Sequence, residues 1–136
     1  MIIKYFIVSC ILFILLDSFW IFSNFNYYLN LSLKIQNEKF IPKIPAALIT
    51  YFFIIISLYF CIRFLELEFT KNNDKNKKYL EIFLYSFLFG LCIYGIYGYT
   101  TCVFLKNYNY YNAFIDTFWG GVLYSMSSLL YFSLLK

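Results

Sequence analysis

The sequence contains no histidine and few charged residues, and both shortages exclude classes of protein. Charged residues make up 13% of the chain, against roughly 25% in an ordinary soluble domain. Without histidine, zinc, haem and histidine-based catalysis lack their usual ligands and bases. Paired aspartates can perform acid/base chemistry, but a membrane-embedded enzyme is the weakest of the hypotheses. We expect no enzyme activity, no metal and no cofactor.

Cysteine is also sparse and is not arranged for chemistry. The four cysteines form no Cys-x-x-Cys pair, and all lie in apolar stretches: Cys10, Cys61, Cys92 and Cys102. Buried thiols of this kind act as small apolar packing residues. The cysteines therefore predict neither a disulfide framework nor a redox site.

Apolar residues are abundant, and they occur in runs long enough to cross a bilayer. A spanning helix needs about 20 mostly apolar residues, and residues 82–105 and 117–135 contain no charge. Residues 44–62 also contain none, and residues 5–33 contain only Asp17. We predict one all-α integral membrane domain over residues 1–136, a four-transmembrane-helix bundle with spans at about 2–22, 46–64, 82–105 and 114–135.

The distribution of basic residues predicts the orientation of these spans. The N-terminal segment resembles a signal peptide but has no Ala-x-Ala cleavage site, so we expect it to stay as a span. Seven basic residues lie on one predicted side and four on the other. By the positive-inside rule, the side with seven is cytoplasmic. It holds both termini and Lys4, Arg63, Lys71, Lys75, Lys77, Lys78 and Lys136; the other side holds Lys34, Lys39, Lys43 and Lys106.

The predicted connections between spans have different characters. Residues 29–36 alternate apolar and polar side chains, the period of a half-buried strand, and we interpret them as an interfacial segment on the lipid headgroups, with Pro42 and Pro45 opening the second span. Asn30 is also a weak match to a glycosylation acceptor. Residues 66–78 are a polar connector whose lysines can contact anionic lipid. Residues 106–112 form a short turn whose tyrosines suit the interfacial belt.

Two acidic residues lie within the spans, and each begins the same short motif. Asp17-Ser-Phe-Trp20 lies in the first span and Asp116-Thr-Phe-Trp119 in the last. Since these spans run in opposite directions, both carboxyl groups are expected in the outer half of the bilayer. Tyr94, Tyr97 and Thr101 are spaced three and four apart and form one stripe of the third span. The stripe can face the aspartates.

A carboxylate within a span is costly and by default indicates function. One interpretation is a polar pocket, open to the outer side, that binds a cation, a proton or a polar solute. The other is structural: Asp17 makes a hydrogen bond to the third span, and Asp116 benefits from the helix dipole near a helix N-terminus. Trp20 and Trp119 either wall the pocket or anchor the helices at the interface.

Small residues in the last two spans predict close helix packing. Gly95, Gly98 and Cys102 share one face of the third span, and small residues form a second face on the fourth: Gly120, Gly121, Ser125 and Ser128. Four helices enclose little volume, so self-association or assembly into a membrane complex is also expected. The lipid bilayer is the main predicted partner, and nothing indicates nucleic-acid binding.

The residues of this polar cluster are also those that resemble a known family. Leu16-Asp17-x-x-Trp20, Tyr94-Gly95-x-Tyr97 with Thr100, and Asp116-x-x-Trp119-Gly120 are similar, in order and spacing, to motifs of the domain of unknown function 2177 family. The resemblance covers nearly the whole chain and implies a four-span membrane fold without an activity. That family usually continues its second motif with Asp, Leu, Thr and Asn, whereas this chain has Gly98-Tyr99-Thr100-Thr101.

Two functions follow as hypotheses. The first is a small transporter-like or solute-binding membrane protein that uses Asp17 and Asp116 as cation or proton sites, with Trp20, Tyr94, Tyr97, Thr100, Thr101 and Trp119 around them. The second is a structural or assembly subunit whose polar cluster fixes the register of the helices.

Overall fold

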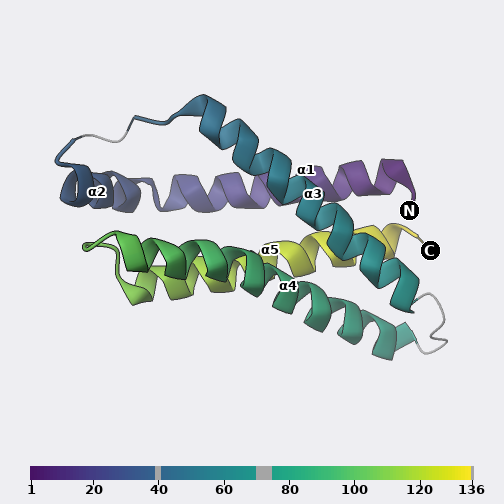
Figure 1. The fold of residues 1–136 in the computed structure, drawn as a ribbon. Coiled ribbons are helices and arrows are strands. Elements are labelled where there is room, and N and C mark those ends of the chain that lie inside the picture. The colour runs from purple at the N-terminus through teal and green to yellow at the C-terminus, as the bar shows by residue number, and fades with distance from the viewer. Residues whose placement is uncertain (39–40, 70–74, 136) are drawn as a thin grey trace.

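Five helices make up the regular structure of the described residues (Figure 1). The structure is a computed structural model and describes residues 1–38, 41–69 and 75–135. The helices are α1 (Ile3–Ser23), α2 (Phe25–Gln36), α3 (Ile44–Phe69), α4 (Lys75–Phe104) and α5 (Tyr110–Leu134). The predicted all-α class is confirmed.

Three of these helices are long and apolar enough to cross a membrane. They cover residues Ile3–Ser23, Ile44–Glu68 and Lys78–Phe104, close to the first three predicted spans. The fourth predicted span corresponds to α5, which has 25 residues but is not among these three helices. The described residues therefore contain three candidate membrane-spanning helices.

Helix α5 is the innermost element of the bundle. Ten of its residues are buried, and many are small or polar, including Gly120, Ser125, Ser127 and Ser128. Tyr124 is fully buried, and its ring packs edge-on against Phe13 of α1, with the ring centroids 5.3 Å apart. A helix surrounded by other helices contacts protein more than lipid, so its surface does not need to be uniformly apolar. This environment accommodates the serines and glycines of α5.

Helices α4 and α5 form an antiparallel hairpin with the closest packing in the fold (Figure 1). A Cβ atom built on Gly90 would lie 2.3 Å from the carbonyl oxygen of Gly120, and one on Gly120 would lie 2.3 Å from Cγ of Tyr94. Only glycine allows such an approach. Gly95 and Gly98 also face α5, at Thr117 and Ala113. Gly90, at the crossing itself, is absent from the sequence-based prediction.

Residues 25–36 are helical, so the alternation of residues 29–36 does not reflect a strand, and the segment interpreted as interfacial is a helix. The chain turns at Asn24, whose side-chain amide donates to the Trp20 carbonyl (2.9 Å), and α2 ends where Asn37 adopts a left-handed φ of 55°. Leu31, Ser32 and Ile35 line one cavity, which is the spacing of a helical face. The sequence also contains the three- and four-residue spacings of this helical face, but the alternation of apolar and polar residues obscured them.

The predicted connector between the second and third spans is shorter than expected. Helix α3 continues to Phe69 and α4 begins at Lys75, so residues 66–69 and 75–78 of the predicted 66–78 connector are helical, and residues 70–74 lie outside the described residues. Glu66 remains inside α3, where it accepts hydrogen bonds from Arg63 (3.0 Å) and from the hydroxyl of Tyr131 on α5. This contact ties α3 to α5 at the end of the bundle where the N- and C-termini lie (Figure 1).

Candidate functional site

A cavity of about 610 Å³ lies at the end of the bundle that holds α2 and the α4–α5 turn. All five helices contribute to its wall. The described lining residues are Asp17, Trp20, Ile21, Phe25, Tyr28, Leu31, Ser32, Ile35, Gln36, Ala47, Thr50, Tyr51, Ile54, Ile93, Tyr94, Tyr97, Thr101, Leu105, Tyr108, Asp116 and Trp119. A volume in this range is typical of small-molecule sites.

Asp17 reaches this cavity from α1 and is held by tyrosines of two other helices. Its side chain is buried, with 7% of its surface exposed. The Tyr51 hydroxyl on α3 donates to Oδ2 at 2.7 Å, and the Tyr94 hydroxyl on α4 donates to Oδ1 at a longer 3.4 Å. Each oxygen thus has a donor, as a buried carboxyl group requires.

Asp116 reaches the same cavity from α5 and has three donors around it. Tyr28 on α2 donates to Oδ1 (3.2 Å), the indole Nε1 of Trp20 approaches the same oxygen (3.4 Å), and Tyr108 donates to Oδ2 (3.1 Å). Asp116 is the seventh residue of α5, which has no acidic residue in its first turn. Because dipole effects fade beyond the first turn, these side-chain donors hold the carboxyl group, and the helix-dipole interpretation is wrong.

The two tryptophans lie between these helices and contact each other. The rings of Trp20 and Trp119 stack, with centroids 4.6 Å apart and planes 15° from parallel. Trp20 turns its Nε1 toward Asp116, whereas Nε1 of Trp119 is buried and has no hydrogen-bond partner among the described residues. The indoles thus form one wall of the cavity.

Tyr28 and Tyr108, which lie outside the three apolar spans, remain hydrogen-bond donors over the physiological pH range. Burial, together with the charge of the nearby Asp116 carboxylate, raises the pKa of both phenols above the ordinary value of tyrosine. A phenol that keeps its proton continues to donate. Asp116 therefore keeps these two donors at neutral pH.

Most residues of the predicted pocket do lie together, but not all. Asp17, Trp20, Tyr94, Asp116 and Trp119 share the cavity wall. Tyr97 and Thr101 also line it, although Tyr97 is 66% exposed and the Thr101 hydroxyl donates to the Tyr97 carbonyl (2.8 Å). Thr100 is exposed and is not part of the described wall.

Sequence reasoning missed the tyrosines that hold the carboxyl groups. The sequence-based prediction places Tyr51 in an apolar span, Tyr28 in the connection after the first span, and Tyr108 in an interfacial turn. A partial signal existed for one of them: Trp20, Asn24 and Tyr28 follow each other at four-residue intervals, the spacing of one helical face. For Tyr51 no such signal distinguishes it from other tyrosines of the chain.

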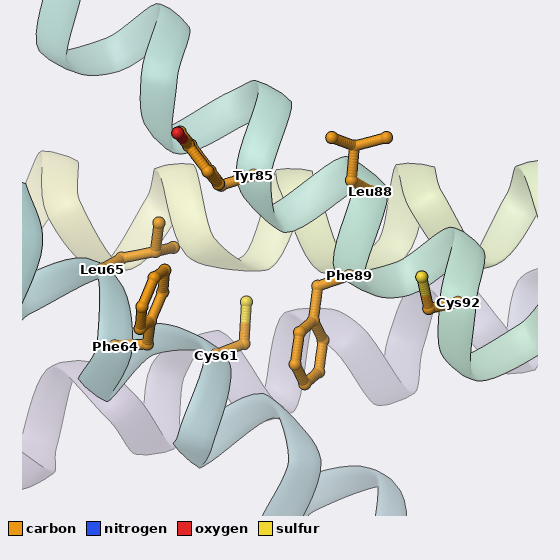
Figure 2. Close-up of a pocket in the computed structure, with 7 residues that line it drawn as sticks. All are labelled: Cys61, Phe64, Leu65, Tyr85, Leu88, Phe89 and Cys92. Atoms are coloured by element: carbon orange, nitrogen blue, oxygen red, sulfur yellow. The ribbon is translucent and has the colours of Figure 1, made fainter.

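A second, smaller hollow of about 160 Å³ lies between α3 and α4 (Figure 2). Its wall is apolar apart from the thiols and the Tyr85 hydroxyl, and is formed by Cys61, Phe64, Leu65, Tyr85, Leu88, Phe89 and Cys92. Figure 2 shows Cys61 and Cys92 on different helices with Phe89 between them. In the part of the chain that the structure describes, no group of three histidine, cysteine or acidic side chains could hold a metal ion.

Comparison with known proteins agrees with the membrane character of the chain. Neither the curated proteins nor the solved structures compared with it gave a match. The sequence model of one family, described as "Predicted membrane protein (DUF2177)", matches residues 2–133. Because this match covers nearly the whole chain, the protein belongs to the DUF2177 family of predicted membrane proteins.

Proposed function

We propose that α5 is the fourth membrane-spanning helix. Its 25 residues extend about 37 Å at 1.5 Å per residue, more than the roughly 30 Å of the hydrocarbon core. It runs back along α4, itself a candidate span, to the end of the bundle where the N-terminus lies (Figure 1). A helix at the outside of the bundle would need a more apolar surface because it would face lipid. The central position of α5 permits its serines and glycines.

In this arrangement both termini are cytoplasmic, and the cavity opens toward the outer side. The support is the excess of basic residues on the side of the termini. Single cysteines placed at Asn107 and at Lys78 in a cysteine-free chain test the topology. Intact cells should allow a membrane-impermeant maleimide to label the cysteine at 107 and should protect the one at 78. The reverse pattern contradicts the orientation, and labelling of both residues from the same side contradicts a spanning α4.

The function that the geometry supports best is binding of a small solute in the cavity between the five helices, as part of a binding or transport cycle. The observation that carries this proposal is the position of two carboxyl groups, Asp17 and Asp116, on the wall of one cavity of about 610 Å³. Carboxyl groups within a membrane domain are costly and usually face a pathway or a site.

A structural role is the second candidate, and the hydrogen bonds favour it. Tyr51 and Tyr94 satisfy both oxygens of Asp17, and Asp116 has donors from three other residues. Such links fix the register of α1, α3, α4 and α5 without a ligand. Self-association also remains a prediction, and a second copy would need another surface because Gly95 and Gly98 face α5 within the same chain.

The two candidates differ in what Asp17→Asn and Asp116→Asn do to the purified chain. If the cavity binds solutes, both variants should fold with near-normal thermal stability and lose solute binding or proton-coupled flux in liposomes. If the role is structural, both should unfold at lower temperature while flux through the liposomes is the same as for the wild type. Glu68→Gln, on α3 and away from the cavity lining, is the control for removing a carboxylate.

A further inference from the structure

The charge and the rings of the cavity wall define a class of ligand. Resting on the solute-binding function proposed above, we infer that the cavity takes an organic cation with an apolar body, such as a bulky ammonium or phosphonium ion. The charged residues that the structure describes around the cavity are Asp17 and Asp116, and both are acidic. A cation is therefore the ligand whose charge this wall complements.

Aromatic rings favour a cation with a large apolar surface. Each of the five helices places at least one ring on the wall: Trp20, Tyr28, Tyr51, Tyr94 and Trp119. Ring faces attract cations, and tryptophan does so most strongly, especially for quaternary onium groups that cannot be strongly hydrated. Leu31, Ile54 and Ile93 complete a wall that is mainly apolar. An apolar body gains from leaving water in such a cavity.

The hydrogen bonds around the carboxyl groups disfavour a small metal cation. Ions such as calcium and magnesium need about six oxygen ligands at short distance. The oxygens of Asp17 and Asp116 already accept bonds from four tyrosines and one tryptophan. An organic cation does not need to displace these donors, since it interacts through its charge and its surface at van der Waals distance.

The size of the cavity agrees with this class of ligand. Its volume of about 610 Å³ lies within the usual range of about 300–1,000 Å³ for sites that enclose drug-sized molecules. A single dehydrated metal ion would leave most of that space to be filled by water or lipid. A cation that carries several apolar groups fills it.

The tryptophans provide a direct assay because the chain contains two and both line the cavity. The purified full chain in nanodiscs of zwitterionic lipid is titrated with tetraphenylphosphonium, with tetraphenylborate of the same shape and opposite charge, and with neutral triphenylphosphine oxide. Empty nanodiscs with free tryptophan correct for partition into lipid. We expect saturable quenching by the phosphonium ion and only unsaturable partition of the other two.

Substitutions and competition by salts test whether binding of the phosphonium ion depends on the two carboxyl groups. Asp17→Asn and Asp116→Asn should each raise the Kd of the phosphonium ion at least tenfold, whereas Glu68→Gln should leave it unchanged. A large excess of sodium or potassium chloride should not displace the probe by more than the ionic strength alone does. The effect of ionic strength is measured separately with choline-free buffer salts. Comparison of the two ions of opposite charge on the wild-type chain requires no variant, so it stands even if an aspartate variant fails to fold.

Distinct results overturn the inference and the proposed function. Saturable, Asp17-dependent binding of the neutral or the anionic probe in place of the cation, or specific displacement by sodium, overturns the organic-cation class and leaves a solute site in place. If none of the three probes binds saturably and no flux depends on Asp17 or Asp116, both the ligand class and the solute-binding function are wrong.

Discussion

The indole rings of Trp20 and Trp119 stack with their centroids 4.6 Å apart and their planes 15° from parallel. The two residues are far apart in the sequence, lie on α1 and α5, and each follows an aspartate by three positions. The two copies of the Asp-x-x-Trp motif therefore lie opposite each other across the bundle. Their tryptophan rings are in contact, and their aspartates, Asp17 and Asp116, reach the same cavity.

This stack predicts a spectroscopic signature. Two indoles this close couple their electronic transitions, so the wild-type chain should show an exciton couplet in circular dichroism. Trp20→Phe and Trp119→Phe should each abolish the couplet, since either one removes a partner. Phe118→Leu, next to the stack in sequence but on an exposed position, is the control and should retain the couplet. A couplet that persists in either tryptophan variant would contradict the stack.

The crossing of α4 and α5 predicts that Gly120→Ala destabilises the fold. The added Cβ would lie 2.3 Å from Cγ of Tyr94, and overpacking of this kind costs about 1–3 kcal/mol. A gain in helix propensity of up to about 1 kcal/mol offsets part of that cost. Unfolding in mixed micelles with increasing dodecyl sulfate measures the difference.

Gly95→Ala is the matched control for the crossing. At Gly95 the nearest atom to a new Cβ is Cγ2 of the Thr117 side chain at 3.3 Å, which a small rotation can relieve. We expect Gly95→Ala to be nearly neutral. Equal destabilisation by both substitutions would indicate that the two glycines contribute through helix flexibility instead of close packing.

The hydrogen bonds to Asp17 predict an order among tyrosine substitutions. Tyr51→Phe removes a donor at 2.7 Å from a buried carboxyl group, and a hydrogen bond to a charged group contributes about 1.5–3 kcal/mol. Tyr94→Phe removes a donor at 3.4 Å and should cost less, because hydrogen bonds weaken with distance. Free energies of unfolding for both variants, with exposed Tyr111→Phe as the control, test the order. A larger loss for Tyr94→Phe than for Tyr51→Phe would contradict the geometry.

Tyr108 predicts a dependence of stability on alkaline pH. Burial, reinforced by Asp116, raises its pKa in the folded chain above the ordinary value of 10.0. The folded state therefore holds the phenolic proton more tightly than the unfolded state. This contribution to stability is fully present below pH 10 and is lost as the pH rises through the higher folded pKa.

The measurement for Tyr108 is the free energy of unfolding between about pH 8 and pH 12. The wild type should lose stability more steeply above about pH 10 than Tyr108→Phe, which has no phenolic proton to release. Tyrosinate absorbance should show one fewer late-titrating group in the variant. Parallel pH curves for the two proteins would contradict the raised pKa.

Gly98 stands where the family resemblance implies an acidic residue, and the structure shows what this position contacts. Gly98 packs against Ala113, with 3.3 Å from its built Cβ to the neighbouring Cα, so a larger residue there would press on α5. In this chain, position 98 is thus used for helix contact. The acidic groups of the cavity wall come from α1 and α5.

The sequence by itself determined the membrane class, the helical fold and most boundaries of the apolar helices. Uncharged runs of about 20 residues leave a chain few options in lipid, since every backbone polar group must be satisfied within the segment. The sequence also indicated Asp17 and Asp116, because carboxyl groups are rare and costly inside spans. These conclusions depend on local composition, which a single sequence displays directly.

Only the tertiary structure decided which side chains meet. Tyr28, Tyr51 and Tyr108 hold the carboxyl groups from three separate segments, and Gly90 allows the closest approach of α4 to α5. These contacts depend on how the helices rotate and cross, which composition does not encode. In the sequence, a tyrosine that donates to Asp17 cannot be distinguished from a tyrosine that faces lipid. The repeated Asp-x-x-Trp motif was visible in the sequence, but the stacking of Trp20 on Trp119 is a property of the packed bundle.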